Sequence, residues 1–457
     1  MQYKMNFNDD SPLRKRFMSG QFFYLVEYEL PAQSEKISKV YEDLNTICEC
    51  ILQEESVAAL TLTDRSDSSK CVEPLDLISK ITARSGVSPI VHLSGKGYDP
   101  ESMADRLAVF ASDGANNVLA MSGDLGSEYQ EYTDSVDIIK KAHTFSGLYV
   151  GAVVNPFKYT VNDSYGQYFK MLCKINAGAE YIVSQVGWDM KKLQELLLFC
   201  RMRDVNVPLI ARLSLLSEED GKRMTTLSLH KGVPISREFA SQVQRELLSS
   251  VQFMTTQLRR LCLQIIGCEF MGYSGVQLCG LHTAEELRTV LKTVAKMKIE
   301  LRTFKEWVEE WQQFHHGVSM ATTPYNFYIF KNLLKYQTVF DIDDNFELTN
   351  ASFDQSTFPQ KWKYKLAASV NLEKRTGLPG KLLRSLLTGS GEEPEHDLRQ
   401  SQYLSMKQCP KKLTYGPCGG GLVNGDCENG QSPCIHNLRL TIAADRNELD
   451  KLEDPDG

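Results

Sequence analysis

The sequence predicts an α/β fold: a (β/α)8 TIM barrel with a C-terminal helical extension and a small Cys-rich metal-binding module. Three observations carry this prediction. Eight short, mostly apolar runs alternate with helical patterns. The first seven runs begin roughly every 30 residues, which is the period of a βαβ unit. Four cysteines gather after residue 408, whereas the other eight are dispersed over the first 280 residues.

The bulk composition is that of an ordinary globular chain. Its 457 residues are 42% hydrophobic and 24% charged, with a formal net charge of -7. The negative charge argues against a nucleic-acid binder, which needs a basic face. No apolar run reaches the ~18 residues of a membrane-spanning helix, and Glu27 and Glu29 interrupt the N-terminal run. We therefore expect a cytoplasmic protein whose cysteines are thiols or metal ligands.

The predicted strands give the order of the barrel. They span residues 22–29, 57–63, 88–93, 117–122, 148–155, 180–185, 207–213 and 275–281, the last after a longer insertion. A doubly wound open sheet is the alternative, because one miscounted strand would remove the closure. No G-x-G-x-x-G turn follows the first strand, which favours the barrel. In a barrel, polar residues at the C-terminal ends of the strands are candidates for the active site.

Beyond the barrel, which we assign to residues 1–300, the pattern becomes helical and then aromatic. A helix is predicted over residues 284–298. The aromatic residues that follow are Trp307, Trp311, Phe314, Tyr325, Phe327, Tyr328 and Phe330. Aromatic side chains mostly supply buried area, so residues 301–387 are expected to form a helical or irregular extension on the barrel. Residues 388–457 comprise a Gly-, Pro- and charge-rich linker and the cysteine module.

Two carboxylates lie on one face of the first predicted strand. Residues two apart project to the same side, so Glu27 and Glu29 would both point into the barrel, and Pro31 would end the strand. Burial raises the pKa of a carboxyl group, which would let one of them donate a proton at neutral pH. Two solvated glutamates on an edge strand are the alternative interpretation.

Further polar residues follow the other strands. Gly123 and Asp124 form the most specific pair, since Gly lets the backbone approach a planar ring whose polar edge the adjacent Asp can bond. Gln185 carries an amide suited to the donor and acceptor edge of a heterocycle. The other polar candidates at or just after strand ends are Thr63, His92, Ser122, Asn155 and His282.

The order of these residues resembles the methylenetetrahydrofolate reductase family over about residues 20–285. The segments that carry the resemblance are Glu27 with Pro31, His92-Leu93-Ser94, Ala120-Met121-Ser122-Gly123-Asp124, Lys174-Ile175-Asn176-Ala177-Gly178-Ala179, Ser184-Gln185 with Asp189, and Gly232-Val233-Pro234-Ile235-Ser236. Each segment is short, and the specificity lies in their order and spacing.

The resemblance implies a flavin, FAD or FMN, at the barrel mouth and reduction of 5,10-methylenetetrahydrofolate to 5-methyltetrahydrofolate. Glu27, or Glu29 in its place, would protonate folate N10, and Asp124 would tune the flavin and orient the pterin. It further implies cofactor contacts from Thr63, His92, Ser122, Gly123, Asn155 and Lys174, and substrate contacts from Gln185 and His282. Two of these depart from the family pattern, which commonly has an aromatic residue at Asn155 and an Arg at His282.

The four C-terminal cysteines have the spacing C-x8-C-x8-C-x6-C. They are Cys409, Cys418, Cys427 and Cys434, separated by Gly and Pro that permit tight turns. Four thiolates so close together can hold one Zn(II) or one [4Fe-4S] cluster, with His436 as a substitute ligand. Four unrelated buried thiols are the alternative. The segment also resembles the C-terminal domain of methylenetetrahydrofolate reductases of anaerobic bacteria.

These observations leave three functions open. The first is flavin-dependent reduction in one-carbon metabolism, with electrons from NADH, from the cysteine module or from a protein partner, in an oligomer or complex. The second is a folate-binding methyl-transfer component without flavin chemistry. The third is an electron-relay or assembly subunit whose barrel is a scaffold. A scaffold would not require Glu27, His92, Asp124 and Gln185 at strand ends, which favours the enzyme.

Overall fold

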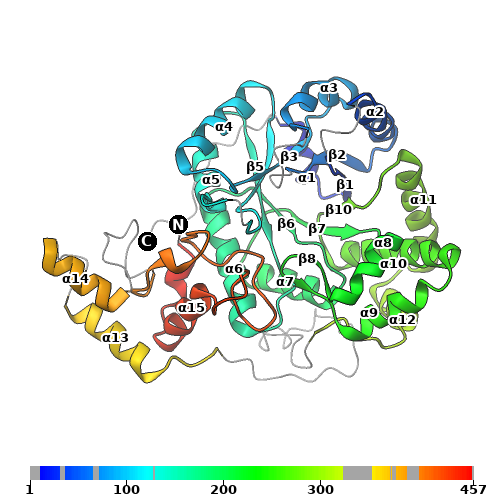
Figure 1. Ribbon diagram of the computed structural model, residues 1–457. Helices are drawn as coiled ribbons and strands as arrows, with labels where there is room; N and C mark the ends of the chain where they lie inside the picture. Colours follow the sequence, from blue (N-terminus) through cyan, green and yellow to red (C-terminus); the bar gives the residue numbers. More distant parts are fainter. Residues whose placement is uncertain are drawn as a thin grey trace.

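The chain folds into a closed barrel followed by a smaller C-terminal part. The computed structural model describes residues 11–30, 37–64, 72–126, 129–322, 353–370, 372, 377–388 and 401–454. Eight parallel strands follow one another around the barrel in the order β1-β10-β7-β6-β5-β4-β3-β2 (Figure 1). The predicted (β/α)8 barrel is confirmed, and the open-sheet alternative is wrong, because β1 pairs with both β2 and β10.

Each predicted strand corresponds to one strand of the barrel. They are β1 Phe23–Tyr28, β2 Val57–Leu62, β3 Ile90–Ser94, β4 Asn117–Met121, β5 Tyr149–Val154, β6 Tyr181–Ser184, β7 Leu209–Ser214 and β10 Gly275–Cys279. The first three are buried along their whole length, as expected for parallel strands covered on both faces. The insertion before the eighth strand contains a small hairpin of β8 Ser228–His230 and β9 Val233–Pro234.

Helices surround the sheet on its outer side (Figure 1). They are α2 Ile37–Gln53, α3 Leu75–Ser85, α4 Pro100–Ser112, α5 Ser135–Ala142, α6 Val161–Asn176, α7 Met190–Met202, α8 Glu218–Arg223, α9 Arg237–Glu246, α10 Ser250–Met271 and α11 Ala284–Glu300. Side-chain caps fix where several begin: Asp99 caps α4, Thr160 caps α6, and Thr283 forms a capping box for α11. The helix predicted over residues 284–298 is therefore confirmed as α11.

The short helix α1 Pro12–Phe17 closes the N-terminal end of the barrel. The Phe17 ring stacks on Phe23 with 4.3 Å between ring centroids, and it meets Tyr149 and Tyr181 edge-on. This aromatic cluster leaves the C-terminal ends of the strands as the mouth of the barrel.

The helix α12 Phe304–His315 packs on α10. Trp307 is fully buried, and its indole N–H donates to the carbonyl oxygen of Leu263 at 2.7 Å. A Cβ at Gly267 would lie 2.2 Å from the Trp307 ring, so the glycine makes room for it. Trp307 and Trp311 thus supply buried area as expected. Phe314, also on α12, is half-buried, whereas Tyr325, Phe327, Tyr328 and Phe330 lie outside the described residues.

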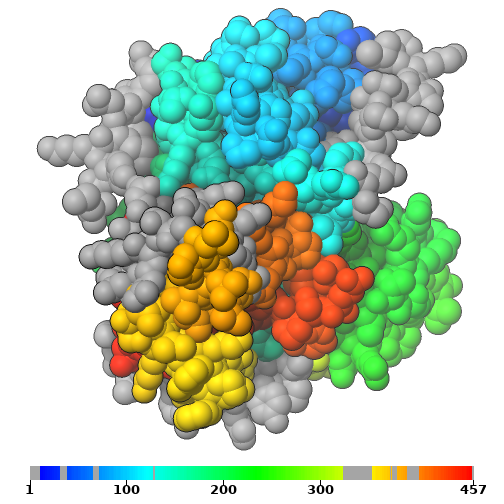
Figure 2. Space-filling view, turned by 60° about the vertical axis from the view of Figure 1, so that its left-hand side comes forward, coloured from blue at the N-terminus to red at the C-terminus, as the bar shows by residue number. Residues whose placement is uncertain are grey.

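The C-terminal part comprises α13 Phe358–Ser369, α14 Gly377–Thr388 and residues 401–454, which we call the C-terminal module. The module contains all four C-terminal cysteines and ends with α15 Ile435–Asp445. In Figure 2 the module, coloured orange to red, sits directly on the cyan and green parts of the barrel. Within the described ranges, no helix has the length and apolar character needed to cross a membrane.

Candidate functional site

The strand ends and the C-terminal module enclose one cavity of about 110 Å³. Seven residues singled out from the sequence line it: His92, Ser122, Gly123, Asp124, Asn155, Lys174 and Gln185. Pro417, Cys418 and Gly419 of the module line it as well. The structure therefore brings most of the predicted site residues together, and it adds a wall that the barrel alone does not supply.

Glu27 lies below this cavity, paired with Arg212 from β7. The guanidinium donates to both carboxylate oxygens, at 2.7 and 2.5 Å, and the Gln277 amide donates to one of them at 2.5 Å. Burial alone would raise the pKa of Glu27, but the Arg212 charge and these bonds lower it to about 2. The expectation of a raised pKa is therefore wrong for this arrangement, because an arginine shares the barrel interior.

Arg212 lines the cavity and is one of the site residues that the sequence did not single out. It also donates to the Gln185 side-chain oxygen at 3.1 Å and to the Cys279 sulfur at 3.2 Å, so one guanidinium links four strands and their ends. The available signal was a charged residue inside the otherwise apolar run 209–213. A charge in such a strand needs a buried partner, and here that partner is Glu27.

Three predicted residues lie away from the cavity. Glu29 follows the last residue of β1 and is exposed, so the prediction that both carboxylates point into the barrel is wrong for it. The Thr63 hydroxyl oxygen accepts a hydrogen bond from the Leu30 amide at 3.1 Å, which fastens the end of β1. His282 is exposed, and its backbone N–H donates to Glu286 at the start of α11.

His92 is buried beside the ion pair. Its Nε2 lies 3.4 Å from the amide nitrogen of Gln277. Burial lowers the pKa of His92 to about 4, with the nearby Glu27 opposing and Arg212 adding to the effect. The ring is therefore neutral at physiological pH, with one nitrogen available as a donor and one as an acceptor.

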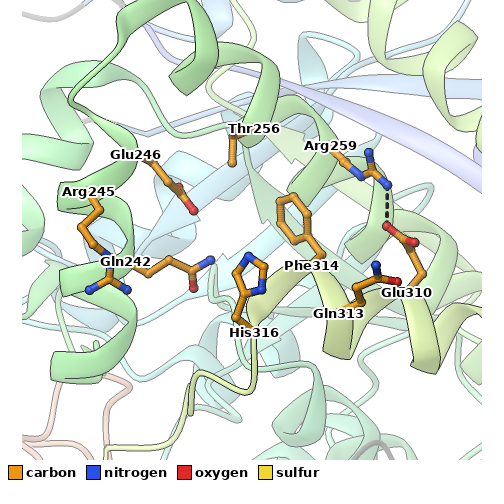
Figure 3. Close-up of a pocket in the computed structure, with 9 residues that line it drawn as sticks. All are labelled: Gln242, Arg245, Glu246, Thr256, Arg259, Glu310, Gln313, Phe314 and His316. Atoms are coloured by element: carbon orange, nitrogen blue, oxygen red, sulfur yellow. Dashed lines mark hydrogen bonds and ion pairs between the residues drawn. The ribbon is translucent and has the colours of Figure 1, made fainter.

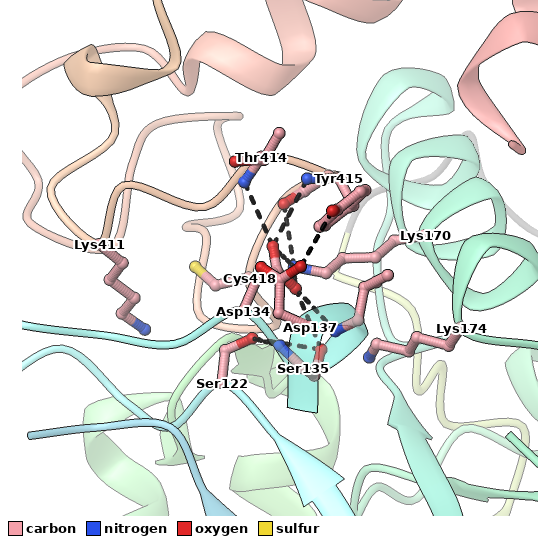
Figure 4. A network of polar contacts seen from close by, with 12 residues as sticks. Ser122, Asp134, Ser135, Asp137, Lys170, Lys174, Lys411, Thr414, Tyr415 and Cys418 are labelled. Carbon is pink, nitrogen blue, oxygen red and sulfur yellow. Dashed lines mark hydrogen bonds and ion pairs between the residues drawn. The ribbon is translucent and has the colours of Figure 1, made fainter. Parts of the chain in front are cut away.

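Two lysines of α6 line the cavity beneath the module. The Lys174 ammonium donates to the Val153 carbonyl at 2.6 Å, and burial together with the Lys170 charge lowers its pKa to about 7. Lys170, which the sequence did not single out, pairs with the buried Asp134 at 3.1 Å (Figure 4). Burial would raise the pKa of Asp134, yet the Lys170 charge holds it below its usual range.

Asp124 lies at the exposed rim, in a turn that the module holds on both sides. The Lys411 ammonium donates to the Gly123 carbonyl at 2.8 Å, and the Leu125 amide donates to Glu428 at 2.8 Å. Lys411 and Glu428 also bond each other at 2.5 Å. Loss of hydration and the Glu428 charge raise the pKa of Asp124.

A flavin does not fit the cavity in this arrangement. Sites for small molecules and cofactors commonly enclose about 300–1,000 Å³, several times the volume present here. The backbone carbonyl of Gly123 and the side-chain amide of Asn155 are already bonded to the module. Asn155 therefore contributes to the docking of the module in this arrangement.

The four cysteines are not gathered into a ligand set. Within the part of the chain that the structure describes, no three His, Cys, Asp or Glu side chains are arranged to hold a metal ion. Burial, with the Cys418 charge adding to it, raises the pKa of Cys409 to about 11 and of Cys434 to about 12. Cys418 packs against the small cluster of buried residues that contains Cys409. To bind a single metal ion, the side chains of all four cysteines would have to move closer to one another.

A second hollow of about 530 Å³ lies between α9, α10 and α12 (Figure 3). Two of its charged residues, Arg259 and Glu310, pair with each other at 2.5 Å, and Glu246 pairs with Arg260 at 2.6 Å. No strand-end residue lines it. The strand-end cavity is therefore the stronger candidate, because it combines position with unusual pKa values.

No curated protein matches the chain. One similar solved structure is described as an uncharacterized protein from Clostridium thermocellum that binds two copies of 5-methyl-5,6,7,8-tetrahydrofolic acid. It has a TM-score of 0.45 and 14% sequence identity, and the match covers 63% of this chain and 99% of that one.

Two family models match the sequence. One, described as methylene-tetrahydrofolate reductase C terminal, covers residues 399–456 and so the whole C-terminal module. The other, described as methylenetetrahydrofolate reductase, covers residues 12–292 and so the entire barrel, more than half of the chain. The chain belongs to the methylenetetrahydrofolate reductase family.

Proposed function

We propose that the chain reduces 5,10-methylenetetrahydrofolate to 5-methyltetrahydrofolate at the mouth of its barrel. Family membership supports the reaction class. The single observation that carries the proposal is the gathering of His92, Asp124 and Gln185 around one cavity with the Glu27–Arg212 pair beneath it. These side chains come from five different strands or the segments that follow them, as in barrel enzymes generally.

Glu27 is the proton donor to folate N10 in this proposal. Its pairing with Arg212 keeps it ionised in the closed arrangement. A ligand whose polar ring edge takes hydrogen bonds from Arg212 and Gln185 would weaken that pairing. Burial would then raise the pKa of Glu27, so that substrate binding itself would prepare the acid.

We also propose that a flavin, FAD or FMN, supplies the hydride, with electrons delivered through the C-terminal module or a partner protein. The family resemblance supports this. Because the closed mouth has no room for a flavin, the proposal requires the mouth to widen. The same lack of room favours the second candidate, a folate-binding methyl-transfer component that works without flavin.

We further propose one metal centre, Zn(II) or [4Fe-4S], at the C-terminal cysteines. The spacing of the four cysteines and the packing of Cys418 beside Cys409 support it. A cluster would supply single electrons, whereas zinc would stabilise the module.

The test is an anaerobic visible spectrum of the purified protein together with folate turnover of two variants. Glu27→Gln should keep folate binding and lose turnover by about 100-fold or more, since general acid catalysis is worth at least that much. Glu29→Gln, two residues away and exposed, is the matched control and should keep turnover. Equal turnover in the wild type and Glu27→Gln would refute the assignment. A colourless protein that binds 5-methyltetrahydrofolate without reduction would favour the methyl-transfer component.

A further inference from the structure

We propose that the C-terminal module is a reversible plug: its loop of residues 416–421 occupies the barrel mouth and must leave before a ligand of folate or flavin size can enter. The inference rests on the proposed function only for the identity of that ligand. The occlusion itself is argued from contacts between barrel and module.

Side chains of the barrel hold the loop by its backbone. Four side chains near the strand ends each donate a hydrogen bond to a carbonyl oxygen of the loop. The pairs are Lys170 to Gly416 at 3.1 Å, Gln167 to Cys418 at 2.8 Å, Asn155 to Gly419 at 2.8 Å and Lys158 to Gly421 at 2.7 Å. The loop thus uses the hydrogen-bonding groups that the mouth would otherwise offer to a ligand.

Lys158 shows why these bonds are exchangeable. Its side chain is 5% exposed, and its ammonium donates to the carbonyls of Gly232 and Gly421. Both of these hydrogen-bond acceptors are neutral backbone carbonyl oxygens. A buried ammonium bonded to neutral carbonyls gains by meeting an anion, because charge-assisted hydrogen bonds are roughly twice as strong. An anionic ligand group would therefore compete well for this lysine.

The docked loop leaves a cavity of only about 110 Å³ above the strand ends, which is too small for a ligand of folate or flavin size, and it is in close contact with the barrel on both sides. Gly232, at the turn of the β8–β9 hairpin, has φ +70°, and a Cβ there would lie 1.9 Å from the Gly419 carbonyl oxygen. A Cβ at Gly166 of α6 would lie 2.9 Å from the Pro417 ring. Ligand and docked loop therefore exclude one another.

Charged contacts at the edge of the mouth act as a latch. Lys411 and Glu428 hold the turn around Asp124, and Lys231 of the hairpin lies 3.7 Å from Glu428. On the other side, Asp134 accepts from the Thr414 amide at 3.2 Å, beside the Lys170 ammonium (Figure 4). Ion pairs of this kind can be replaced by water and salt as the module moves away.

The side chains of the site are also paired among themselves. Glu27 is bonded to Arg212 and Gln277, and the Gln185 side-chain oxygen accepts from Arg212. These pairs stabilise the charged groups of the site without a ligand, although the Gln277 side-chain oxygen is buried without a hydrogen-bond partner among the described residues. The closed arrangement is thus a resting state from which binding must release the loop.

The experiment measures access to His92, which lines the cavity, with diethylpyrocarbonate and peptide mass spectrometry on the full chain. Lys411→Met and Glu428→Ala break the latch, and Lys412→Met is the matched control, since Lys412 is exposed and pairs with the exposed Glu131. We expect His92 to react at least tenfold faster in both latch variants than in the wild type, and at the wild-type rate in Lys412→Met. Equal rates in all four proteins would overturn the plug, whether or not any ligand binds.

A second measurement follows amide hydrogen exchange in residues 416–421 of the wild type as FAD or 5-methyltetrahydrofolate is added. The plug predicts that these amides lose protection when either probe binds. A gain of protection would overturn it and make the loop a wall of the occupied site. If neither probe binds to any variant while His92 becomes accessible, the plug is supported and the proposed function fails.

Discussion

Removal of Arg212 tests how the barrel interior controls the charge of Glu27. The pKa of Glu27 is lowered from its ordinary value of 4.5 to about 2, although burial alone would raise it. A lowered carboxyl pKa contributes stability that is present above pH 4.5 and lost as the pH falls through 2. At about 1.4 kcal/mol per tenfold change in proton affinity, the contribution at pH 7 is about 3 kcal/mol.

Arg212→Met should therefore lower the free energy of unfolding at pH 7 by about 3 kcal/mol or more, because it leaves a buried carboxylate without its partner. For a barrel of this size that is a fall in Tm of about 6 °C or more, measurable by differential scanning fluorimetry. The loss should be smaller at pH 4, where the unpaired Glu27 takes up a proton. The double variant Arg212→Met/Glu27→Gln should recover most of it. An equal fall in Tm at pH 4 and 7, or no recovery in the double variant, would refute this account.

The remaining predictions concern Lys174 and Cys418. The pKa of Lys174 is lowered to about 7, so its charged form destabilises the fold below pH 7 and the penalty disappears as the pH rises toward its ordinary value of 10.5. Lys174→Met should therefore stabilise the protein by about 2–4 kcal/mol at pH 6 and by little at pH 10.5; a gain independent of pH would contradict the assignment. The wild type should contain iron or zinc by elemental analysis, whereas Cys418→Ser should lose it, and its module should melt at a lower temperature. Stoichiometric metal in that variant would rule out Cys418 as a ligand.

The barrel could be predicted from the sequence because its signals are local. Each strand is a short apolar run, and the repeat of the βαβ unit determines the closure. The placement of Gly123, Asp124 and Gln185 followed from their positions at strand ends. The Glu27–Arg212 pair could not be predicted in the same way, because it joins residues 185 apart in the sequence. The prediction that Glu29 points into the barrel is wrong for a local reason. The strand β1 ends at Tyr28, so the alternation of side chains along a strand no longer applies to Glu29.

The docking of the C-terminal module on the barrel mouth could not be predicted from the sequence either. In the segment between Cys409 and Cys427, the sequence points to the thiols as the functional groups, whereas the contacts with the barrel are made by backbone carbonyl oxygens. Every residue type has a backbone carbonyl oxygen, so the side chains of the loop do not indicate which groups of the barrel it binds. The lysines and amides that receive it look like ordinary polar residues of a helix and a strand end.

Hydrogen bonds from barrel side chains to backbone carbonyl groups also determine how the interface between barrel and module can change in evolution. When a side chain meets a backbone carbonyl, substitution on the loop side leaves the bond intact as long as the backbone can follow the same path. Only positions such as Gly232, where a Cβ would meet the loop, remain constrained. Residues on the two sides therefore have little reason to change together. Correlated substitutions across related sequences should be weak here, even though barrel and module are in direct contact.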